Sequence, residues 1–182
     1  MSKTGIILAG GKSSRMNQDK GLMILDGKPM VQYVIDIFKN LVDDIIIISN
    51  NPEYEQFGYP VYSDLVKDKG PLAGIYTGLF YSQSETNIVL SCDVPYVSHE
   101  LISFLLSEHK EYQITIPKKD ERTHQLIGVF SKSCEANFAI SIEKDELKLI
   151  SAFKNLNLDI VDANQFDIDL FRNLNSPDDL EN

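Results

Sequence analysis

The sequence predicts an α/β protein of three layers, in which helices cover both faces of a mostly parallel sheet. Short apolar runs, typical of strands buried on both faces, recur along the chain. Longer segments with apolar residues at helical spacing separate these runs, so strands and helices alternate. In open sheets of this kind, ligands bind beyond the carboxyl ends of the strands, and we expect the functional residues there.

The predicted strands are apolar runs that end at glycine or at turn formers. The clearest is a run of four isoleucines, 45–48, which stops at Ser49-Asn50-Asn51-Pro52. The run 4–8 ends at a glycine pair, and the run 87–91 ends at Cys92-Asp93-Val94-Pro95. The expected strands are 4–8, 45–48, 60–62, 87–91, 114–116, 126–130 and 158–161.

The predicted helices begin at recognisable start signals. Pro29 stands at a plausible first helical position, Gly70-Pro71-Leu72 opens an apolar segment, and Ser98 is typical of an N-cap. Apolar residues then recur at helical spacing. The expected helices are 29–40, 72–81, 98–109, 134–140 and 147–153.

Composition indicates a globular, cytoplasmic protein. The chain of 182 residues has 43% hydrophobic and 24% charged residues, which predicts one domain over residues 1–182. No apolar run approaches the roughly 20 residues that span a bilayer, so we expect no membrane association. Cys92 and Cys134 follow no metal or redox spacing, and we expect reduced thiols.

Charge is unevenly distributed along the chain. The net charge is −10, which disfavours nucleic acid as a partner. Residues 1–28, however, carry five Lys or Arg against two Asp or Glu, which is net +3 and leaves −13 on the other 154 residues. A local cationic patch on an acidic protein suits a small polyanion such as a nucleoside triphosphate.

The cations gather on a glycine loop that follows the first predicted strand. Gly10 and Gly11 permit positive φ and close approach of backbone amides to phosphate, and Lys12, Arg15 and Lys20 add charge. Two unit charges about 4 Å apart near a protein surface interact by roughly 4 kcal/mol. A tight turn with solvated lysines is the alternative interpretation.

Two familiar phosphate loops do not match. A Walker A motif ending at Gly11-Lys12-Ser13 would need its first glycine at Ile6, inside the strand, and no Gly-x-Gly-x-x-Gly fingerprint is present.

The loop resembles the signature of nucleotidyltransferases that use a Rossmann-like domain. The matching residues are Leu8-Ala9-Gly10-Gly11-Lys12-Ser13-Ser14-Arg15-Met16, followed by Asp19-Lys20. Within that family the double glycine and the Asp-Lys pair are most similar to the molybdenum cofactor guanylyltransferases.

The resemblance extends through most of the chain. Motifs similar to those of the family follow in order: Gly27-Lys28-Pro29, Ser63-Asp64, Gly70-Pro71-Leu72-Ala73-Gly74, Cys92-Asp93-Val94-Pro95 and Asn173-Leu174-Asn175-Ser176-Pro177. Two positions depart from the pattern. Asn17 replaces the usual glycine after Arg-Met, and Gln125 follows His124 where His-Pro is common.

The resemblance implies the activity and most of the site. It implies transfer of GMP from GTP to the phosphate of molybdopterin, with Mg²⁺ as cofactor and pyrophosphate as the second product. Arg15, Lys20 and Asp93 are the implied catalytic residues, with Asp93 also on the metal. The implied GTP-binding residues are Leu8, Ala9, Gly10, Gly11, Lys12, Ser13, Lys20, Asp64 and Asp93.

The position of Asp93 also supports a role as a metal ligand. It nearly directly follows a predicted buried strand, where its carboxylate could offer an oxygen ligand to Mg²⁺. A turn or N-cap aspartate is the alternative. Asp68 and Asp145 are expected to be solvated.

The acceptor side is less defined by the sequence. His124, Asn173 and Asn175 are candidates for contact with the pterin, with a polar tail as the alternative for the two asparagines. Other proteins of cofactor biosynthesis, or molybdoenzymes, are expected as transient partners.

Three alternative functions remain open. A cytidylyl- or sugar-nucleotidyltransferase would share the fold and the metal. A non-catalytic nucleotide-binding protein would keep the loop without turnover. A P-loop GTPase is disfavoured by the missing glycine and by the lack of an Asn-Lys-x-Asp tetrad.

Overall fold

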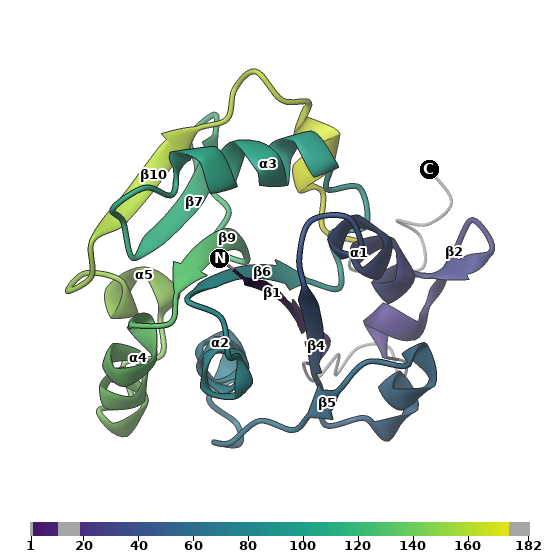
Figure 1. Cartoon of the computed structure of the whole chain (residues 1–182), viewed down its shortest axis with the longest axis horizontal. Coiled ribbons are helices and arrows are strands. Elements are labelled where there is room, and N and C mark those ends of the chain that lie inside the picture. The colour runs from purple at the N-terminus through teal and green to yellow at the C-terminus, as the bar shows by residue number, and fades with distance from the viewer. Residues whose placement is uncertain (1, 11–18, 175–182) are drawn as a thin grey trace.

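In the computed structural model, which describes residues 2–10 and 19–174, one twisted sheet runs through the molecule (Figure 1). Among the described residues it has eight strands, in the order β10-β7-β9-β6-β1-β4-β5, with β8 paired to β7. The strands are β1 (Lys3–Leu8), β4 (Asp44–Ile48), β5 (Val61–Tyr62), β6 (Thr86–Ser91), β7 (Ile114–Lys119), β8 (Arg122–Thr123), β9 (Ile127–Ser131) and β10 (Leu158–Asp162).

Strand direction divides the sheet into two parts. β1 is parallel to β4 and β6, and β4 is parallel to β5. β9 is antiparallel to both β6 and β7, and β7 is parallel to β10. The segment between β7 and β9 is too short for the helical crossover that parallel neighbours need, so the chain returns through β8 in the opposite direction.

Helices cover both faces of the sheet, which gives the three layers. α1 (Met30–Phe38) and α3 (His99–Glu108) pack on one face. α2 (Gly70–Tyr81), α4 (Cys134–Glu143) and α5 (Leu149–Ala152) pack on the other.

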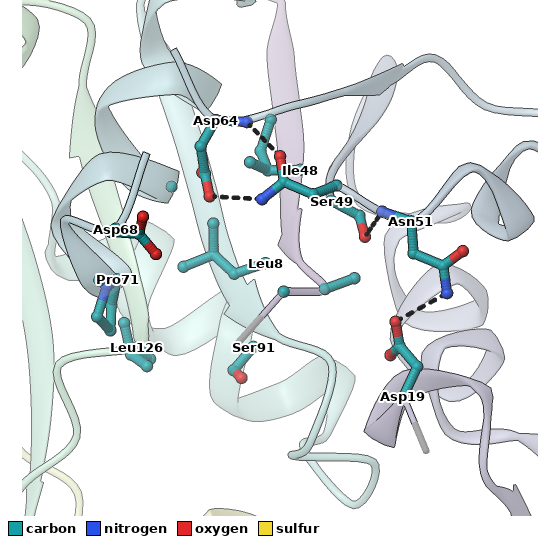
Figure 2. Close-up of a pocket in the computed structure, with 15 residues that line it drawn as sticks. Leu8, Asp19, Ile48, Ser49, Asn51, Asp64, Asp68, Pro71, Ser91 and Leu126 are labelled. Atoms are coloured by element: carbon teal, nitrogen blue, oxygen red, sulfur yellow. Dashed lines mark hydrogen bonds between the residues drawn. The ribbon is translucent and has the colours of Figure 1, made fainter. Parts of the chain in front are cut away.

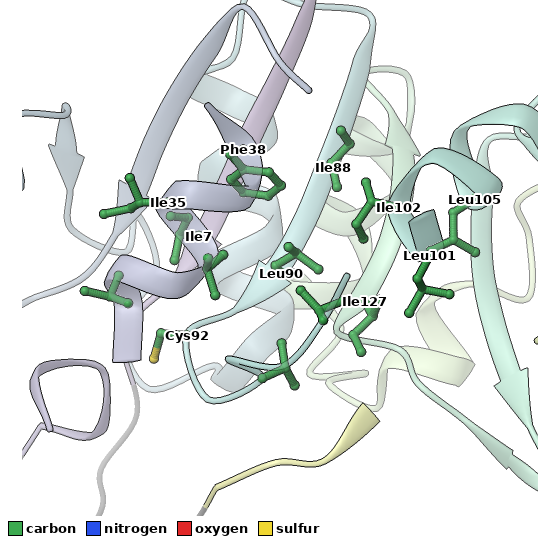
Figure 3. Close-up of a cluster of buried hydrophobic side chains, with 14 of the residues drawn as sticks. Ile7, Ile35, Phe38, Ile88, Leu90, Cys92, Leu101, Ile102, Leu105 and Ile127 are labelled. Atoms are coloured by element: carbon green, nitrogen blue, oxygen red, sulfur yellow. The ribbon is translucent and has the colours of Figure 1, made fainter. Parts of the chain in front are cut away.

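Alternation along the central strands divides the core between the two faces. In β4, Ile45 and Ile47 face the α1 and α3 side, and Ile46 and Ile48 face the α2 side. Figure 3 shows the first of these clusters, in which Phe38 of α1 lies against the sheet. Because both faces are buried, the strands read as continuous apolar runs.

Two glycines allow the helices to lie close to β1. A Cβ on Gly5 would lie 2.5 Å from the Phe38 ring, and a Cβ on Gly78 of α2 would collide with Ile6. Helices therefore pack closely on both faces of β1. This packing holds β1 in place, and the glycine loop follows directly from its end.

The predicted fold class is confirmed, and each predicted strand and helix is present, with small shifts at the ends. Ser98 caps α3 as expected and accepts a hydrogen bond from the Leu101 amide at 3.2 Å. Pro29 was placed wrongly, because it precedes α1 with ψ of 142° and pairs with Ile24.

The hairpin of β2 (Ile24–Leu25) and β3 (Lys28–Pro29) was not predicted, nor was β8, because two-residue strands carry no periodicity. The 3₁₀ helices η1 (Lys20–Leu22), η2 (Pro52–Phe57) and η3 (Ile168–Phe171) were also missed, because such short helices do not show the repeating apolar pattern of an α-helix. In the part of the chain that the structure describes, no helix has the length and apolar character needed to cross a bilayer.

Candidate active site

A cleft of about 650 Å³ opens at the carboxyl ends of β1, β4, β5 and β6 (Figure 2). Its floor is formed by the ends of the central strands, and the N-terminus of α2 forms one wall. The described lining residues are Leu8, Ala9, Gly10, Asp19, Ile48, Ser49, Asn50, Asn51, Asp64, Asp68, Gly70, Pro71, Gly74, Ser91 and Leu126.

Asn50 and Asp64 form a reciprocal pair on this cleft. The Asn50 amide donates to Asp64 Oδ2 at 3.3 Å, and the Asp64 backbone N–H donates to Asn50 Oδ1 at 3.3 Å. Burial raises the pKa of the Asp64 carboxyl above its usual value, and the Asn50 bond acts in the opposite direction. The pair holds a carboxylate oxygen at the cleft wall, where it can accept hydrogen bonds from a ligand.

Asp19 stands on the opposite side of the cleft, with its carboxylate bound by neighbours. Asn51 Nδ2 donates to Asp19 Oδ2 at 3.1 Å, as the dashed line in Figure 2 marks. The Gly21 amide donates to Asp19 Oδ1 at 3.2 Å, and the buried Tyr54 hydroxyl donates to the same oxygen. Asp19 thereby caps η1, the 3₁₀ helix that begins with Lys20.

Lys20 and Asp93 come together although 73 positions separate them. Lys20 Nζ lies 4.0 Å from Asp93 Oδ2, and their side chains are 28% and 14% exposed. Asp93 Oδ1 is buried and has no hydrogen-bond partner among the described residues. A buried carboxylate oxygen without a partner is costly, which is the arrangement expected of a group that a ligand completes.

A second cavity of about 590 Å³ lies beside β8 and η3. Its lining is strongly charged: Lys119, Asp120, Glu121, Arg122, His124, Ile168, Asp169, Phe171, Arg172 and Asn173. The Leu174 amide, directly after Asn173, donates to the Asp93 carbonyl at 2.9 Å. This bond brings one end of the second cavity to Asp93.

His124 is buried in the second cavity against Phe171, with ring centroids 4.6 Å apart. Burial, with a smaller contribution from the charge of Arg122, lowers the pKa of His124 to about 4. The imidazole is therefore neutral at pH 7. Among the described side chains its Nε2 has no partner.

The structure brings several of the predicted site residues together. Leu8, Ala9, Gly10 and Asp64 line the cleft, and Lys20 pairs with Asp93. His124 and Asn173 line the second cavity. Gly11, Lys12, Ser13, Arg15 and Asn175 lie outside the described residues.

Some expectations about individual residues change. Gly10 is not among the glycines with positive φ, and a Cβ there would meet only the Ile48 carbonyl oxygen at 3.9 Å, so no left-handed turn or protein contact requires glycine at this position. Asp68 and Asp145 are exposed, as expected, although Asp68 also lines the cleft and Asp145 pairs with Lys69 at 2.8 Å. The N-terminus of α2 faces the cleft, since Gly70 and Pro71 line it.

Sequence reasoning missed Asn50, Asn51 and Tyr54, and it missed the basic residues of the second cavity. The turn Ser49-Asn50-Asn51-Pro52 was read only as the end of a strand. Its position at the carboxyl end of a buried parallel strand was the signal that could have placed the two asparagines in the site.

Asp93 fits a role as a metal ligand. Mg²⁺ commonly binds through one or two carboxylates and the phosphates of its substrate, and the unpartnered Oδ1 of Asp93 meets that need. Over residues 2–10 and 19–174, no group of three or more His, Cys, Asp or Glu side chains forms a metal cage.

Comparison with known proteins gives a consistent result. Residues 5–156 match the family model of the MobA-like NTP transferase domain. A protein of Flavobacterium johnsoniae, called a probable molybdenum cofactor guanylyltransferase, is 39% identical over 97% of this chain and 94% of its own. The molybdenum cofactor guanylyltransferase of Yersinia pestis is 38% identical over 98% of this chain and 93% of its own.

A solved structure shares the fold. The molybdopterin-guanine dinucleotide biosynthesis protein A of Archaeoglobus fulgidus superposes with a TM-score of 0.82, at 23% identity, over 98% of this chain and 95% of its own. The match over most of the chain, the close full-length relatives and the Lys20–Asp93 pair agree. The chain belongs to the MobA-like NTP transferase family and is a nucleotidyltransferase of the molybdenum cofactor guanylyltransferase type.

Proposed function

We propose that this protein transfers GMP from GTP to the terminal phosphate of molybdopterin and releases pyrophosphate. A phosphate oxygen of molybdopterin attacks the α-phosphorus of GTP, the new P–O bond forms, and the bond to the β-phosphate breaks. The observation that carries the proposal is the approach of Lys20 to Asp93 beside a cleft of nucleotide size. Transfers of this kind depend on positioning and on stabilisation of charge.

The residues divide the work by position. Lys20, 4.0 Å from Asp93, neutralises charge that grows at the α-phosphate. Lys12 and Arg15, outside the described residues, hold the β- and γ-phosphates, and the backbone of the loop from Leu8 to Ser13 cradles the nucleotide. Bound at Asp93, Mg²⁺ would supply Lewis-acid stabilisation of the phosphates.

The cleft supports guanine as the base. Its described lining carries three carboxylates, Asp19, Asp64 and Asp68, and no Lys or Arg. The Watson–Crick edge of guanine offers two adjacent N–H donors, which suit a carboxylate acceptor. We assign Asp64 as the acceptor for this edge. Asn50 holds the Asp64 carboxylate in place, and burial disfavours its charged form unless a further donor, such as the guanine edge, binds it.

The second cavity supports an acceptor site. It adjoins Asp93 through the Leu174 bond and offers basic side chains for a phosphate and the His124–Phe171 pair for a planar ring. We assign His124, Asn173 and Asn175 to the acceptor side.

The proposal also includes a single nucleotidyltransferase domain over residues 1–182 and a cytoplasmic location. It further includes transient contacts with other cofactor-biosynthesis proteins or molybdoenzymes.

The test is a nucleotide panel. Purified protein receives GTP, CTP, ATP or UTP with Mg²⁺ and molybdopterin, and pyrophosphate release is followed. We expect release with GTP, dependent on Mg²⁺ and on the acceptor. Release with CTP alone would identify a cytidylyltransferase, release only with a sugar phosphate as acceptor would identify a sugar-nucleotidyltransferase, and no release with any nucleotide would identify a non-catalytic binding protein.

A further inference from the structure

The carboxylates of Asp19, which precedes Lys20, and of Asp93, which lies 4.0 Å from it, differ in their hydrogen bonding. Both oxygens of Asp19 accept hydrogen bonds, Oδ1 from Gly21 N and the Tyr54 hydroxyl and Oδ2 from Asn51. Asp93 Oδ1 has no partner within the described chain. Three hydrogen bonds to its two oxygens hold the Asp19 carboxylate in place, which indicates a structural task although Asp19 lines the cleft.

Two of the three donors to the Asp19 carboxylate, Asn51 and Tyr54, come from the segment that follows β4. Asn51 caps η2 by accepting the Glu53 amide on Oδ1 at 3.0 Å, which leaves its Nδ2 to reach Asp19. Tyr54 follows three positions later, and residues three apart lie on one face of a 3₁₀ helix. Burial above all, with Cys92 and Asp19 nearby, raises the pKa of Tyr54, so its hydroxyl remains a donor.

Asp19 in turn fixes the backbone on both sides of Lys20. The Leu22 amide donates to the Asp19 carbonyl at 3.1 Å, and the Met23 amide donates to the Lys20 carbonyl at 3.1 Å. Gly21 has no room for a Cβ, which would collide with the Tyr54 hydroxyl and lie 3.1 Å from Cys92 Sγ. The Cα of Lys20 is therefore held from both directions.

We propose that Tyr54 and Asn51 are positioning residues that act through Asp19 to hold Lys20 beside Asp93. The inference rests on the proposed function, since it assigns Lys20 to the α-phosphate. It adds residues from the turn after β4 to the catalytic arrangement, and it makes Asp19 a structural support of Lys20.

A double-mutant cycle with Tyr54→Phe and Lys20→Ala tests the proposal in the full chain. Tyr54→Phe removes one hydroxyl, and we expect kcat to fall roughly 3- to 10-fold, the value of one hydrogen bond, while the KM for GTP changes by less than about twofold. In the Lys20→Ala background the same change should lower kcat by less than about twofold, because the lysine that it positions is gone.

Two further variants test whether a loss of kcat comes from the hydrogen bonds to Asp19. Tyr59→Phe removes the same hydroxyl from a tyrosine of the same segment outside the Asp19 network, and it should leave kcat unchanged. Asn51→Ser keeps a capping oxygen for η2 but lacks the amide that reaches Asp19, so it should also lower kcat. This variant tests the proposal if Tyr54→Phe fails to fold. Wild-type turnover in Tyr54→Phe, or an equal loss with and without Lys20, would overturn the proposal.

A measurement without turnover separates this proposal from the proposed function. Limited acetylation of the full-length protein, located by mass spectrometry, reports how accessible Lys20 is. Tyr54→Phe should raise the acetylation rate of Lys20 at least about twofold, while that of Lys154 stays constant. An unchanged rate would overturn the positioning role, whereas a wild-type protein that releases no pyrophosphate would count only against the proposed function.

Discussion

The cleft at the ends of β1, β4, β5 and β6 and the cavity beside β8 and η3 satisfy their polar groups differently. In the cleft, Asp64 is paired with Asn50, and Asp19 with Asn51 and Tyr54. Near the second cavity, Asp93 Oδ1 and His124 Nε2 are two of the three buried side-chain polar atoms that have no partner within the described chain. The first region is organised before a ligand arrives, and the second holds groups that a ligand would complete.

The sheet explains part of this difference. The cleft lies where parallel strands end together, so turns from neighbouring strands meet and bond one another. The second cavity lies at the antiparallel hairpin of β7 and β8, and its other wall is the 3₁₀ helix η3 with the residues that follow it. Regularity in one half of the sheet and irregularity in the other thus correspond to two kinds of site.

The largest expected effect is at the junction of the two regions. Asp93→Asn keeps the shape of the side chain and removes its charge, and we expect kcat to fall on the order of 100- to 1,000-fold. Steady-state pyrophosphate release measures it, with thermal unfolding as the check on folding. A variant that keeps more than a tenth of wild-type turnover would remove Asp93 from the catalytic role.

The second prediction concerns the pH dependence of stability. The pKa of His124 is about 4 in the folded protein, below the value near 6.5 of an unfolded histidine. The unfolded chain therefore binds the extra proton between these two values, so the free energy of unfolding falls as pH drops from 6.5 towards 4, by at most about 3 kcal/mol.

Urea unfolding at several pH values measures this contribution. In His124→Gln the fall between pH 6.5 and 4 should be smaller than in the wild type by that amount. His99→Gln is the control, because the His99 side chain is exposed at the start of α3 and lies away from the second cavity. Equal pH dependence in wild type and His124→Gln would show that the His124 imidazole is not buried in its neutral form.

The third prediction tests the cleft as the reader of the base. Asp64→Asn places an amide where we expect a carboxylate to accept from guanine, and the KM for GTP should rise about 10-fold with little change in kcat. Competition between GTP and CTP measures selectivity directly. Asn50→Asp is informative alongside, since it removes the amide that donates to Asp64. Unaltered selectivity in Asp64→Asn would assign base recognition to other residues.

The smallest expected effect is at the rim of the second cavity. Arg172 is only partly buried, so Arg172→Ala should raise the KM for molybdopterin about 2- to 5-fold and leave the KM for GTP unchanged. Lys132→Ala, in which the removed cation pairs with Glu135 on α4, controls for the loss of charge. If both variants behaved alike toward molybdopterin, the assignment of the second cavity to the acceptor would be wrong.

Much of the fold was predictable because it depends on local patterns. The isoleucines 45–48 and the apolar run 87–91 form strands buried on both faces, and such strands are recognisable in the sequence as continuous apolar runs. The direction of β9 was within reach too, because so few residues separate it from β7. Lys20 and Asp93 were singled out by a family motif, and the structure adds that they lie 4.0 Å apart.

The rest of the site depends on contacts that no local pattern records. Tyr54 reads as an ordinary residue of a polar turn, yet it is fully buried and bonds to Asp19, 35 positions earlier. His124 is buried because Phe171, 47 positions later in the sequence, packs against it. Such roles arise only when distant segments meet.

The bond from the Leu174 amide to the Asp93 carbonyl has a consequence for synthesis of the protein. Leu174 is 1% exposed and packs with Met23, Leu25 and Met30, so the late segment binds both the Asp93 loop and the early hairpin. The surroundings of Asp93 are therefore complete only after translation has passed Leu174, and a chain shortened before that residue should lack the full site.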